Sequence, residues 1–551
     1  MKAKKLKYQL MGMATMLCPI IFAGCTDWND HYDGAGLESG SNTTLWQELS
    51  QNPQVSDFCS VLSQTKVFRQ HKKTPVSYAD LLSSGQSFTV IAPLNGTFDR
   101  DSLILLAQTV QGDSLVEKSF IQNHIARSLN SITPDAQSFR MLNTKHLKVE
   151  GNEIEGVRIL SPNQHAKNGV LHVAERAMPF HRNLYELLCD DPNLNDVGSR
   201  LRTYEEDYFD ADASVSSGVF EGVPIWIDSV IVSYNRMLSS VGYIDSEDST
   251  YWTVAPTNAE WNRVWNEATQ YFVYDAKVEK RDSIQNYWTT RSILEDAVFN
   301  MTDQTSVTDS LMSVPYLSYR RTRRAAKVPR HVFRQPFADG GILAKAQDVD
   351  CSNGKLWVVN EWPYTPMNTF FTELWTECEQ TAMITDFKDC VYNSRSLVAD
   401  SISDGGYLQI MPRTATSNWN LTFRINNTLS GTYDICAIVL PKSVENVDSA
   451  KAIMPCKFKA ALTYVDENGS NKTESSSKTF QNRPLVVDTI TLFEDFRFPT
   501  CNYDQDEIKV SLKLTCNVSN TPAELKKFNR ELFLDCIYLR PKAAATNENE
   551  Q

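Results

Sequence analysis

The histidines are the first residues to test for catalysis, and none of the eight lies in a catalytic or metal-binding motif. The chain has no His-Glu-x-x-His, no His-x-His and no cysteine–histidine cluster with the spacing of zinc ligands. It also lacks the Gly-x-Ser-x-Gly turn that exposes a nucleophilic serine and the Gly-x-x-x-x-Gly-Lys loop that binds phosphates. We therefore expect a protein that is not an enzyme, with no cofactor and no metal site. Paired carboxylates for glycoside cleavage remain an alternative, because only their separation in space defines them.

Three charged clusters have side chains that can bind ions. Glu205-Glu206-Asp207 with Asp210 and Asp212, and Asp504-Gln505-Asp506-Glu507, offer oxygen ligands for calcium, but neither has the EF-hand spacing, so solvated loops are the favoured interpretation. Guanidinium groups bind planar oxyanions through paired hydrogen bonds, so the basic cluster is a candidate anion-binding site. The alternative is an exposed insertion that pairs with the domain's own acids. The basic cluster comprises Arg320, Arg321, Arg323, Arg324, Lys327, Arg330 and Arg334.

Cys25 stands at the end of a segment with the layout of an export signal. Four lysines lie within the first seven residues, an apolar run from Leu10 to Ala23 follows, and Gly24 precedes the cysteine. The run is shorter than the roughly 20 residues that cross a bilayer. The segment resembles the lipobox of bacterial lipoproteins, which implies removal of residues 1–24 and attachment of lipid, including palmitate, to Cys25. An ordinary secreted protein is the alternative.

The lipobox resemblance implies a location and a tether. Residues 25–42 are expected to form a lipidated tether, since residues 34–44 are rich in Gly, Ser, Asn and Thr. Thr26 rather than an aspartate follows the cysteine, which favours the outer membrane over retention at the inner one. The expected location is the outer membrane, at the cell surface, with its periplasmic face as the alternative.

Composition limits the partners and the redox chemistry. The chain has 551 residues and a net charge of −13, which predicts several domains and argues against nucleic acid as a partner. After Cys18 leaves with the signal and Cys25 takes lipid, ten cysteines remain in the body. No Cys-x-x-Cys spacing occurs, and buried thiols and disulfides are equally compatible with the pattern.

Two stretches of the chain share a pattern that indicates duplication. Phe88–Phe98 and Tyr251–Trp261 both carry Ala-Pro-x-Asn-x-x-aromatic, 163 residues apart. At the same offset, Ile121-Gln122-Asn123-His124 aligns with Ile284-Gln285-Asn286-Tyr287. An Asn-Gly turn before an alternating strand recurs at Asn168 and Asn353, where the offset has grown to 185. The pattern predicts two repeats, the second with about 22 extra residues, and a helix capped by Asn95 after the first box.

These elements resemble the fasciclin-like domain, whose boxes are Thr-Val-x-Ala-Pro-x-Asn-x-x-Phe, a central histidine and Asn-Gly-x-x-His-Val. The first repeat, residues 43–182, matches all three boxes. The second repeat, residues 183–363, is divergent, with Tyr287 in place of the central histidine and Trp357 in place of the last one. The resemblance implies an α/β fold and a role in adhesion, and His124 and His172 are expected to be buried structural supports. The motif residues are Pro93, Asn95, Phe98, His124, Asn168, Gly169 and His172, then Pro256, Asn258, Trp261, Asn353 and Gly354.

Residues 364–543 consist of short alternating runs separated by turn residues, which predicts a β-sandwich. The run from Leu532 to Pro541 is similar to the last strand of galactose-binding-like jelly rolls, a group that contains many carbohydrate-binding modules. Residues 544–551 are expected to be a tail. The predicted fold is therefore α+β and multidomain, with two fasciclin-like α/β domains followed by an all-β sandwich.

The predicted function is adhesion or ligand binding by a membrane-anchored, non-catalytic surface lipoprotein. Its expected partners are the membrane, through the lipid anchor, and a glycan or a surface protein. The alternatives are a glycan-processing enzyme and a structural subunit of an outer-membrane assembly.

Overall fold

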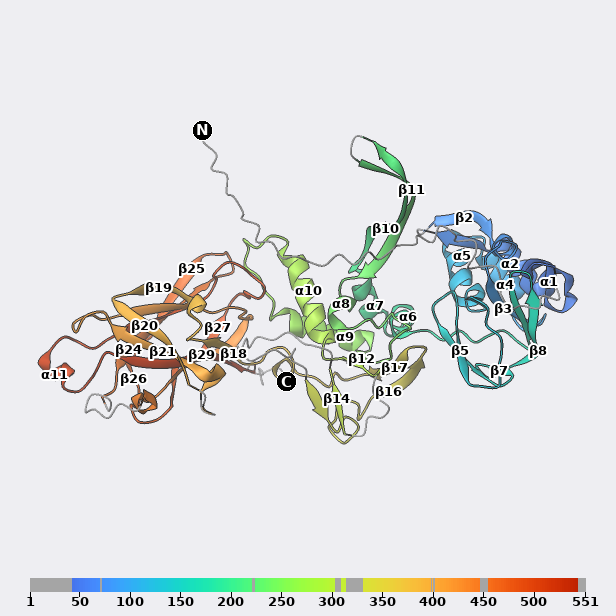
Figure 1. Ribbon diagram of the computed structural model, residues 1–551. Coiled ribbons are helices and arrows are strands. Elements are labelled where there is room, and N and C mark those ends of the chain that lie inside the picture. Colours follow the sequence, from blue (N-terminus) through green and yellow to red (C-terminus); the bar gives the residue numbers. More distant parts are fainter. Residues whose placement is uncertain are drawn as a thin grey trace, which may run out of the picture. The chain divides into compact units, whose positions relative to one another are not determined.

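The computed structural model describes residues 42–69, 72–220, 223–302, 309–313, 331–397, 399, 402–445 and 454–543 (Figure 1). These residues form two compact units. The first contains the described residues up to Val67, Lys73–Leu142 and Lys148–Met178, and the second contains Asn143–Leu147, the described part of Phe68–Lys72 and everything described from Pro179 onward. Among the described residues, no helix is long and apolar enough to cross a membrane.

The first unit is built on one seven-stranded sheet with helices packed against it. The central strands β3 and β9 are parallel and buried along their whole length, which explains why both read as continuous apolar runs. The strand order is β4 (Ile125–Arg127), β3 (Phe88–Pro93), β9 (Gly169–Ala174), β8 (Val157–Ala166), β7 (Glu153–Ile154), β6 (His146–Glu150) and β5 (Gln137–Arg140). A separate hairpin pairs β1 (Lys66–Arg69) with β2 (Lys72–Ser77).

The helices of the first unit bury one apolar core with β3 and β9. Leu45, Phe58, Val90 and Leu171 belong to this core and are fully buried or nearly so. The helices are α1 (Leu45–Gln51), α2 (Ser56–Gln64), α3 (Tyr78–Leu82), α4 (Arg100–Leu106) and α5 (Val110–Val116), with the 3₁₀-helix η1 (Pro53–Val55) and the π-helix η2 (Glu117–Ile121).

The second repeat places its elements in the same chain order around a smaller sheet. Its central strands β12 (Tyr251–Pro256) and β17 (Gly354–Val359) are again parallel, flanked by β13 (Val298–Asn300) and β16 (Gln347–Cys351). Strands β14 (Ser310–Met312) and β15 (Val332–Arg334) form a separate pair. The helices are α6 (Leu184–Asp190), α7 (Asn195–Arg202), α8 (Leu238–Val241), α9 (Asn258–Thr269) and α10 (Arg281–Leu294).

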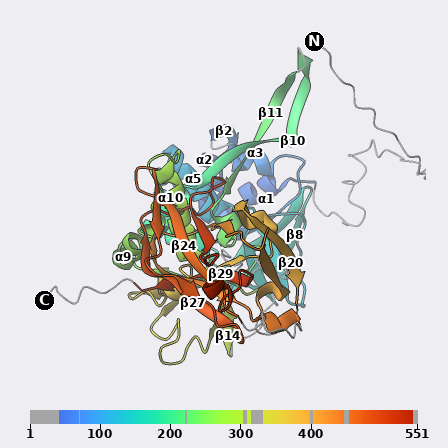
Figure 2. The ribbon, with the colours of Figure 1, turned by 90° about the vertical axis from the view of Figure 1, so that its left-hand side faces the viewer.

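Two insertions distinguish the part of the second repeat that precedes β13 from the corresponding part of the first. Where the first has the short β1–β2 hairpin, the second has β10 (Glu205–Phe220) and β11 (Val223–Asn235). They form a two-stranded ribbon that extends beyond α7 and α8 in Figure 1 and is also seen in Figure 2. The first acidic cluster begins this ribbon, so the loop predicted at residues 205–212 is wrong: these residues belong to β10. The second insertion is the connection between α9 and α10, which is longer than the α4–α5 connection.

The C-terminal region confirms the predicted β-sandwich. One sheet has the order β20 (Cys390–Ser396), β21 (Gly406–Pro412), β29 (Leu532–Lys542), β23 (Gly431–Val439) and β27 (Asp488–Phe498), with β18 (Leu374–Glu377) also paired to β29. The other has the order β19 (Ile384–Lys388), β22 (Asn420–Arg424), β28 (Ser511–Cys516), β24 (Lys457–Val465) and β25 (Asn471–Ser475), with β26 (Phe480–Gln481) on β24. The short helices are η3 (Pro366–Asn368), η4 (Thr381–Met383), η5 (Ser403–Gly405), η6 (Lys442–Glu445) and α11 (Pro522–Leu525).

The sandwich and the second repeat share one hydrophobic core. Tyr271 and Phe272, in the α9–α10 connection, pack their rings against Phe370 at centroid distances of 5.4 and 5.6 Å. The backbone of Val273 accepts a hydrogen bond from the Cys501 amide at 2.6 Å. The longer connection of the second repeat is therefore the segment that contacts the sandwich.

Candidate functional site

Asn168 and Asn353 make the same three hydrogen bonds in the two repeats. Asn168 Oδ1 accepts from the Leu45 amide at 2.7 Å, and its Nδ2 donates to the carbonyls of Leu82 and Ser84. Asn353 Oδ1 accepts from the Leu184 amide at 2.9 Å, and its Nδ2 donates to the carbonyls of Ile244 and Ser246. Both side chains are buried. Each asparagine thus joins the start of the repeat's first helix to the segment that precedes the central strand.

Asn95 and Asn258 form a second matching pair, but they do not have the predicted role. Asn95 Oδ1 accepts from the Asp57 amide at 2.9 Å, and its Nδ2 donates to the Pro53 carbonyl. Asn95 therefore caps the first turn of α2, which precedes it in the chain. The prediction that it caps the following helix is wrong, because Asp99 caps α4 by accepting from the Ser102 amide.

Asn258 repeats this geometry on α7. Its Oδ1 accepts from the Asp196 amide at 3.0 Å, and its Nδ2 donates to the carbonyl of Pro192. We call Asn95, Asn168, Asn258 and Asn353 the frame asparagines. Their bonds fix helices to the central strands in both repeats, so the motif asparagines act on the fold.

The motif glycines and prolines lie at the two ends of the parallel strand pairs. A Cβ on Gly169 would lie 2.1 Å from the Phe88 carbonyl oxygen, and a Cβ on Gly354 would lie 1.8 Å from that of Tyr251, so only glycine fits where the paired strands begin. Pro93 and Pro256 end the strands β3 and β12, where they pair with Ala174 and Val359. Proline has no backbone N–H, and at the end of a strand this lack interrupts no further hydrogen bond of the sheet.

Two motif histidines are buried and bonded to the backbone through both ring nitrogens. His124 Nε2 accepts from the Met178 amide at 2.9 Å, so its Nδ1 carries the proton and donates to the Phe120 carbonyl at 2.7 Å. His172 Nδ1 accepts from the Asn163 amide at 3.0 Å, and its Nε2 donates to the Asn130 carbonyl at 2.9 Å. Burial lowers the pKa of His124 to about 4 and also lowers the pKa of His172. Both rings are therefore neutral structural groups near pH 7.

The structure corrects the alignment of His124 with Tyr287. The Ile91 amide donates to the His124 carbonyl, and the equivalent Val254 amide donates to the Ala297 carbonyl. Ala297 therefore occupies the position of His124, while Tyr287 lies in the middle of α10. The second repeat carries extra residues before β13. The match between Ile121–His124 and Ile284–Tyr287 therefore keeps the same spacing in the sequence but does not mark equivalent positions in the fold. Trp357 does occupy the position of His172, since His172 pairs with Ile91 and Trp357 pairs with Val254.

The remaining predicted residues lie in the core, on the surface or outside the described residues. Phe98 packs on Phe120 at a centroid distance of 4.9 Å, and Trp261 is buried in the second repeat. Arg334 is exposed on β15. Cys25 and the other six residues of the basic cluster, Arg320, Arg321, Arg323, Arg324, Lys327 and Arg330, lie outside the described residues.

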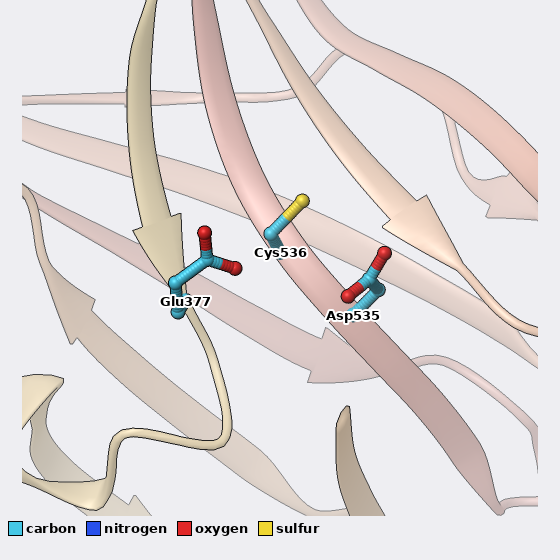
Figure 3. A group of neighbouring side chains, drawn as sticks. All are labelled: Glu377, Asp535 and Cys536. Carbon is cyan, nitrogen blue, oxygen red and sulfur yellow. The ribbon is translucent and has the colours of Figure 1, made fainter. Parts of the chain in front are cut away.

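A further group, which the sequence analysis did not single out, lies inside the sandwich. Ligand atoms of Glu377, Asp535 and Cys536 lie within 4.8 Å of one another, and all three residues are buried. Figure 3 shows Glu377 on β18 and the other two on the neighbouring strand β29. The group was hidden because 158 positions separate its halves, which the pairing of Glu377 with Cys536 brings together. We call it the acid–thiol group.

Burial and neighbouring carboxylates set the electrostatics of the acid–thiol group. Burial raises the pKa of the Cys536 thiol, and Asp535, Glu377 and the adjacent Glu379 raise it further. The same acids raise the pKa of the buried Cys378 thiol. Ser403 donates from its hydroxyl to Glu377 at 2.7 Å and from its amide to Asp535 at 3.2 Å. Two carboxylates and a thiol are donors that zinc accepts, whereas calcium would use the oxygens alone.

The ten body cysteines all carry free thiols. Cys456 lies directly before β24 and Cys516 ends the neighbouring strand β28, and a hydrogen bond between their sulfurs raises the pKa of Cys456 and lowers that of Cys516. Trp419 is fully buried and donates to the Arg530 carbonyl, so it is a core residue. Trp375 is half-buried and stacks on Tyr538 at a centroid distance of 4.8 Å.

Comparison with known protein families identifies one domain in the chain. The Fasciclin domain family matches residues 55–179, inside the predicted first repeat. The described elements from α2 to β9 fall within that match. The first repeat is thus a fasciclin domain. A search of curated proteins gave no match.

Solved structures give three likenesses at low identity. An FAS1 domain pair from the insect cell adhesion molecule fasciclin I is 12% identical, with 51% of this chain and 89% of that chain covered and a TM-score of 0.16. A xylan-binding domain from CBM 22 is 12% identical, with 31% and 94% covered and a TM-score of 0.20. The CBM22-1-GH10 modules of a Clostridium thermocellum xylanase, complexed with xylohexaose, are 12% identical, with a TM-score of 0.18. That match spans 31% of this chain and only 27% of the other. TM-scores of this size assign neither a fold nor a ligand.

Proposed function

We propose that this chain is a non-catalytic adhesion or ligand-binding protein of a bacterial cell surface, whose ligand is a glycan. The observation that carries the proposal is the fasciclin domain at residues 55–179, because domains of this family serve adhesion. Two fasciclin-type domains in series followed by a sandwich give a body with several binding surfaces on one chain.

The second fasciclin-type domain is supported by the frame asparagines. Asn258 and Asn353 make the bonds that Asn95 and Asn168 make in the matched domain, to backbone groups at corresponding places. A glycine at the start of the last strand meets the same steric limit in both repeats. Two unrelated domains would have no reason to share a set of bonds this specific.

A non-catalytic role is supported by the way the reactive groups are used. His124 and His172 have both ring nitrogens bonded to backbone groups, so neither can transfer a proton to a substrate without losing a structural bond. The carboxylates of Glu377 and Asp535 are buried, and a glycosidic bond could not reach them.

A glycan is supported as the ligand by the charge of the chain and by its architecture. The net charge of −13 disfavours polyanions and anionic lipid surfaces as general partners, and neutral sugars do not meet this repulsion. Sugars are bound through many hydroxyl contacts on rigid surfaces, and the two strand layers of the sandwich provide such a surface.

A glycan array with the body in solution tests this proposal. Residues 25–551 with Cys25→Ser would be applied to neutral and acidic glycans, and the bound sugars would be checked for cleavage by mass spectrometry. Binding without cleavage is expected. Cleavage would overturn the non-catalytic role, and a silent array would overturn the glycan as ligand.

The proposal includes a lipid anchor at Cys25 in the outer membrane. Lysines, an apolar run and Gly24 before the cysteine support it. Two acyl-chain attachments are needed to hold a protein stably on a membrane, and lipoproteins provide them. In cells, Cys25→Ala should move the protein to the soluble fraction and abolish incorporation of labelled palmitate. A variant that stayed in the membrane and remained labelled would contradict the anchor.

A further inference from the structure

An open groove lies where the two sheets of the sandwich end. Strand β25 is at the end of one sheet and β27 is at the end of the other. Between them, together with the loop Ser476–Lys478, is a hollow with a volume of about 260 Å³. We call it the edge groove. Its position at two sheet ends leaves it accessible from solvent, which a cavity between the sheets would not be.

The edge groove is lined by polar and aromatic residues. Glu474, Lys478 and Glu494 are exposed on the rim, and the Lys478 ammonium is 3.9 Å from the Glu494 carboxylate. Phe493 and Phe496 also line the groove, and each has less than a tenth of its surface exposed. The lining therefore offers acceptors and a donor to the polar groups of a ligand, and the small exposed parts of two rings to its carbon atoms.

One serine of the loop fixes the shape of the groove. Ser476 Oγ accepts from the Ala460 amide at 3.1 Å and donates to the Lys478 carbonyl at 3.1 Å, so it ties the loop to β24. Ser475 and Ser477 lie on either side of it and are exposed. Both residues line the groove beside a backbone that Ser476 holds in place, which is how an orienting polar group is best presented.

We propose that the edge groove binds the terminal unit of a neutral glycan. Carboxylates accept hydrogen bonds from sugar hydroxyls, lysine donates to them, and the carbon atoms of a sugar contact the exposed parts of aromatic rings. The volume is just below the range of about 300–1,000 Å³ that is usual for drug-sized ligands, which suits one end of a chain rather than a long stretch. This inference rests on the proposed glycan-binding function and names the place where the glycan binds.

The same residues argue against other ligand classes. Two carboxylates against one ammonium give the rim a net negative charge, which repels phosphate, sulfate and uronate groups. A purely apolar ligand would remove water from the rim charges and offer no hydrogen bonds in its place. A neutral molecule with many hydroxyls meets neither difficulty.

Variants of the rim test the inference on the whole body, residues 25–551 with Cys25→Ser. The double variant Glu474→Gln with Glu494→Gln removes both charges at constant shape, and Ser477→Trp fills the groove. Asp386→Asn is the matched control, because Asp386 is an exposed acid on β19, at the opposite end of the sheet that ends in β25. Melting temperatures establish that each variant is folded.

The readout is the dissociation constant for the neutral glycan that the unsubstituted body binds best on the array. The double variant should weaken binding about tenfold or more, because it loses two charge-assisted hydrogen bonds. Ser477→Trp should abolish binding, and Asp386→Asn should leave it unchanged. Unchanged binding by both groove variants would overturn the edge groove and leave the proposed glycan-binding function standing. An unsubstituted body that bound no glycan would overturn both.

Discussion

The two repeats use the same frame asparagines and differ in what they add to them. Both hold their first helices to the central parallel strands through equivalent asparagine side chains. The first repeat adds two buried histidines, whereas Ala297 and Trp357 stand at those positions in the second. The comparison shows that the asparagines and glycines are required by the backbone geometry, while the histidines are one of several ways to fill the core.

The repeats also differ in how they are completed. The first encloses a core of its own. The second extends the α9–α10 connection, which contacts the sandwich through Tyr271, Phe272 and Val273, so its core continues into that domain. The longer α9–α10 connection is thus one of the segments through which the second repeat joins the larger unit.

The largest expected effect comes from removing a buried frame asparagine. Asn168→Ala and Asn353→Ala each leave one amide and two carbonyls without their partner, which should lower the free energy of unfolding by about 4 kcal/mol. In hydrogen exchange on the full body, Asn168→Ala should reduce protection in the first repeat alone. Asn353→Ala should reduce it in the second repeat and in the sandwich, because they share a core. Protection lost only in the second repeat would contradict that shared core.

The next effect is a pH dependence confined to the first repeat. The pKa of His124 is about 4 in the folded protein and roughly 6.5 when unfolded, so the unfolded state binds the proton more readily. The stabilisation is fully present above pH 6.5 and is lost as the pH falls toward 4, by up to about 3 kcal/mol. Protonated Nε2 could no longer accept from the Met178 amide.

Urea-dependent hydrogen exchange at pH 7 and pH 4, corrected for intrinsic exchange rates, would measure this loss. His124→Gln is the control variant, since it cannot titrate. The difference in pH dependence between the unsubstituted chain and this variant should appear in β3 and be absent from β12. An equal acid sensitivity of β3 in both proteins would refute the role of His124.

A smaller effect is expected at the contact between the second repeat and the sandwich. Lys509 is buried and lies 3.0 Å from the Asp275 carboxylate of the α9–α10 connection. Lys509→Met should lower the free energy of unfolding of the second unit by about 2 kcal/mol, because it leaves Asp275 buried without its cation. Lys345→Met, at an exposed ion pair with Glu361, is the control and should cost less than about 1 kcal/mol. Equal losses in chemical denaturation would show that the contact contributes little.

The smallest expected effect tests whether Asn95 and Asn258 have equivalent roles in the two repeats. Asn95→Ala and Asn258→Ala remove side-chain caps at the surface, which typically contribute about 1 kcal/mol. We expect similar losses for the two variants, each detected as faster exchange in its own helix, α2 or α7. A loss at Asn95 with none at Asn258 would break the proposed correspondence.

Much of the fold could be predicted from local pattern. Alternating runs located the sandwich strands β22, β23, β24, β27, β28 and β29. The Ala-Pro-x-Asn box and the Asn-Gly turns located the strands that the structure pairs in parallel in both repeats. These patterns each span only a few neighbouring residues, so they can be recognised without knowing how the rest of the chain folds. The sequence did not predict that Ala297 occupies the position of His124. An insertion before β13 shifts the equivalent residue along the chain, and a chance four-residue match pointed to Tyr287 instead.

The parts that could not be predicted depend on contacts between distant segments. Asn95 was expected to cap the next helix, the usual local choice, but its partner is 38 positions earlier in the chain. The acid–thiol group requires β18 to pair with β29, and the edge groove requires the ends of two sheets to lie side by side. No spacing of residues in the sequence predicts either of these contacts. The boundary predicted between residues 363 and 364 stays a prediction, as do the anchor and the basic cluster.

Native-state hydrogen exchange of the full body across a urea series tests the difference between the repeats most directly. Amides of β12 and β29 should lose protection together, at one urea concentration and with one dependence on it, because they belong to one cooperative unit. Amides of β3 should open in a separate transition. If β12 opened with β3, or alone, while β29 stayed protected, the shared core of the second repeat and the sandwich would be contradicted.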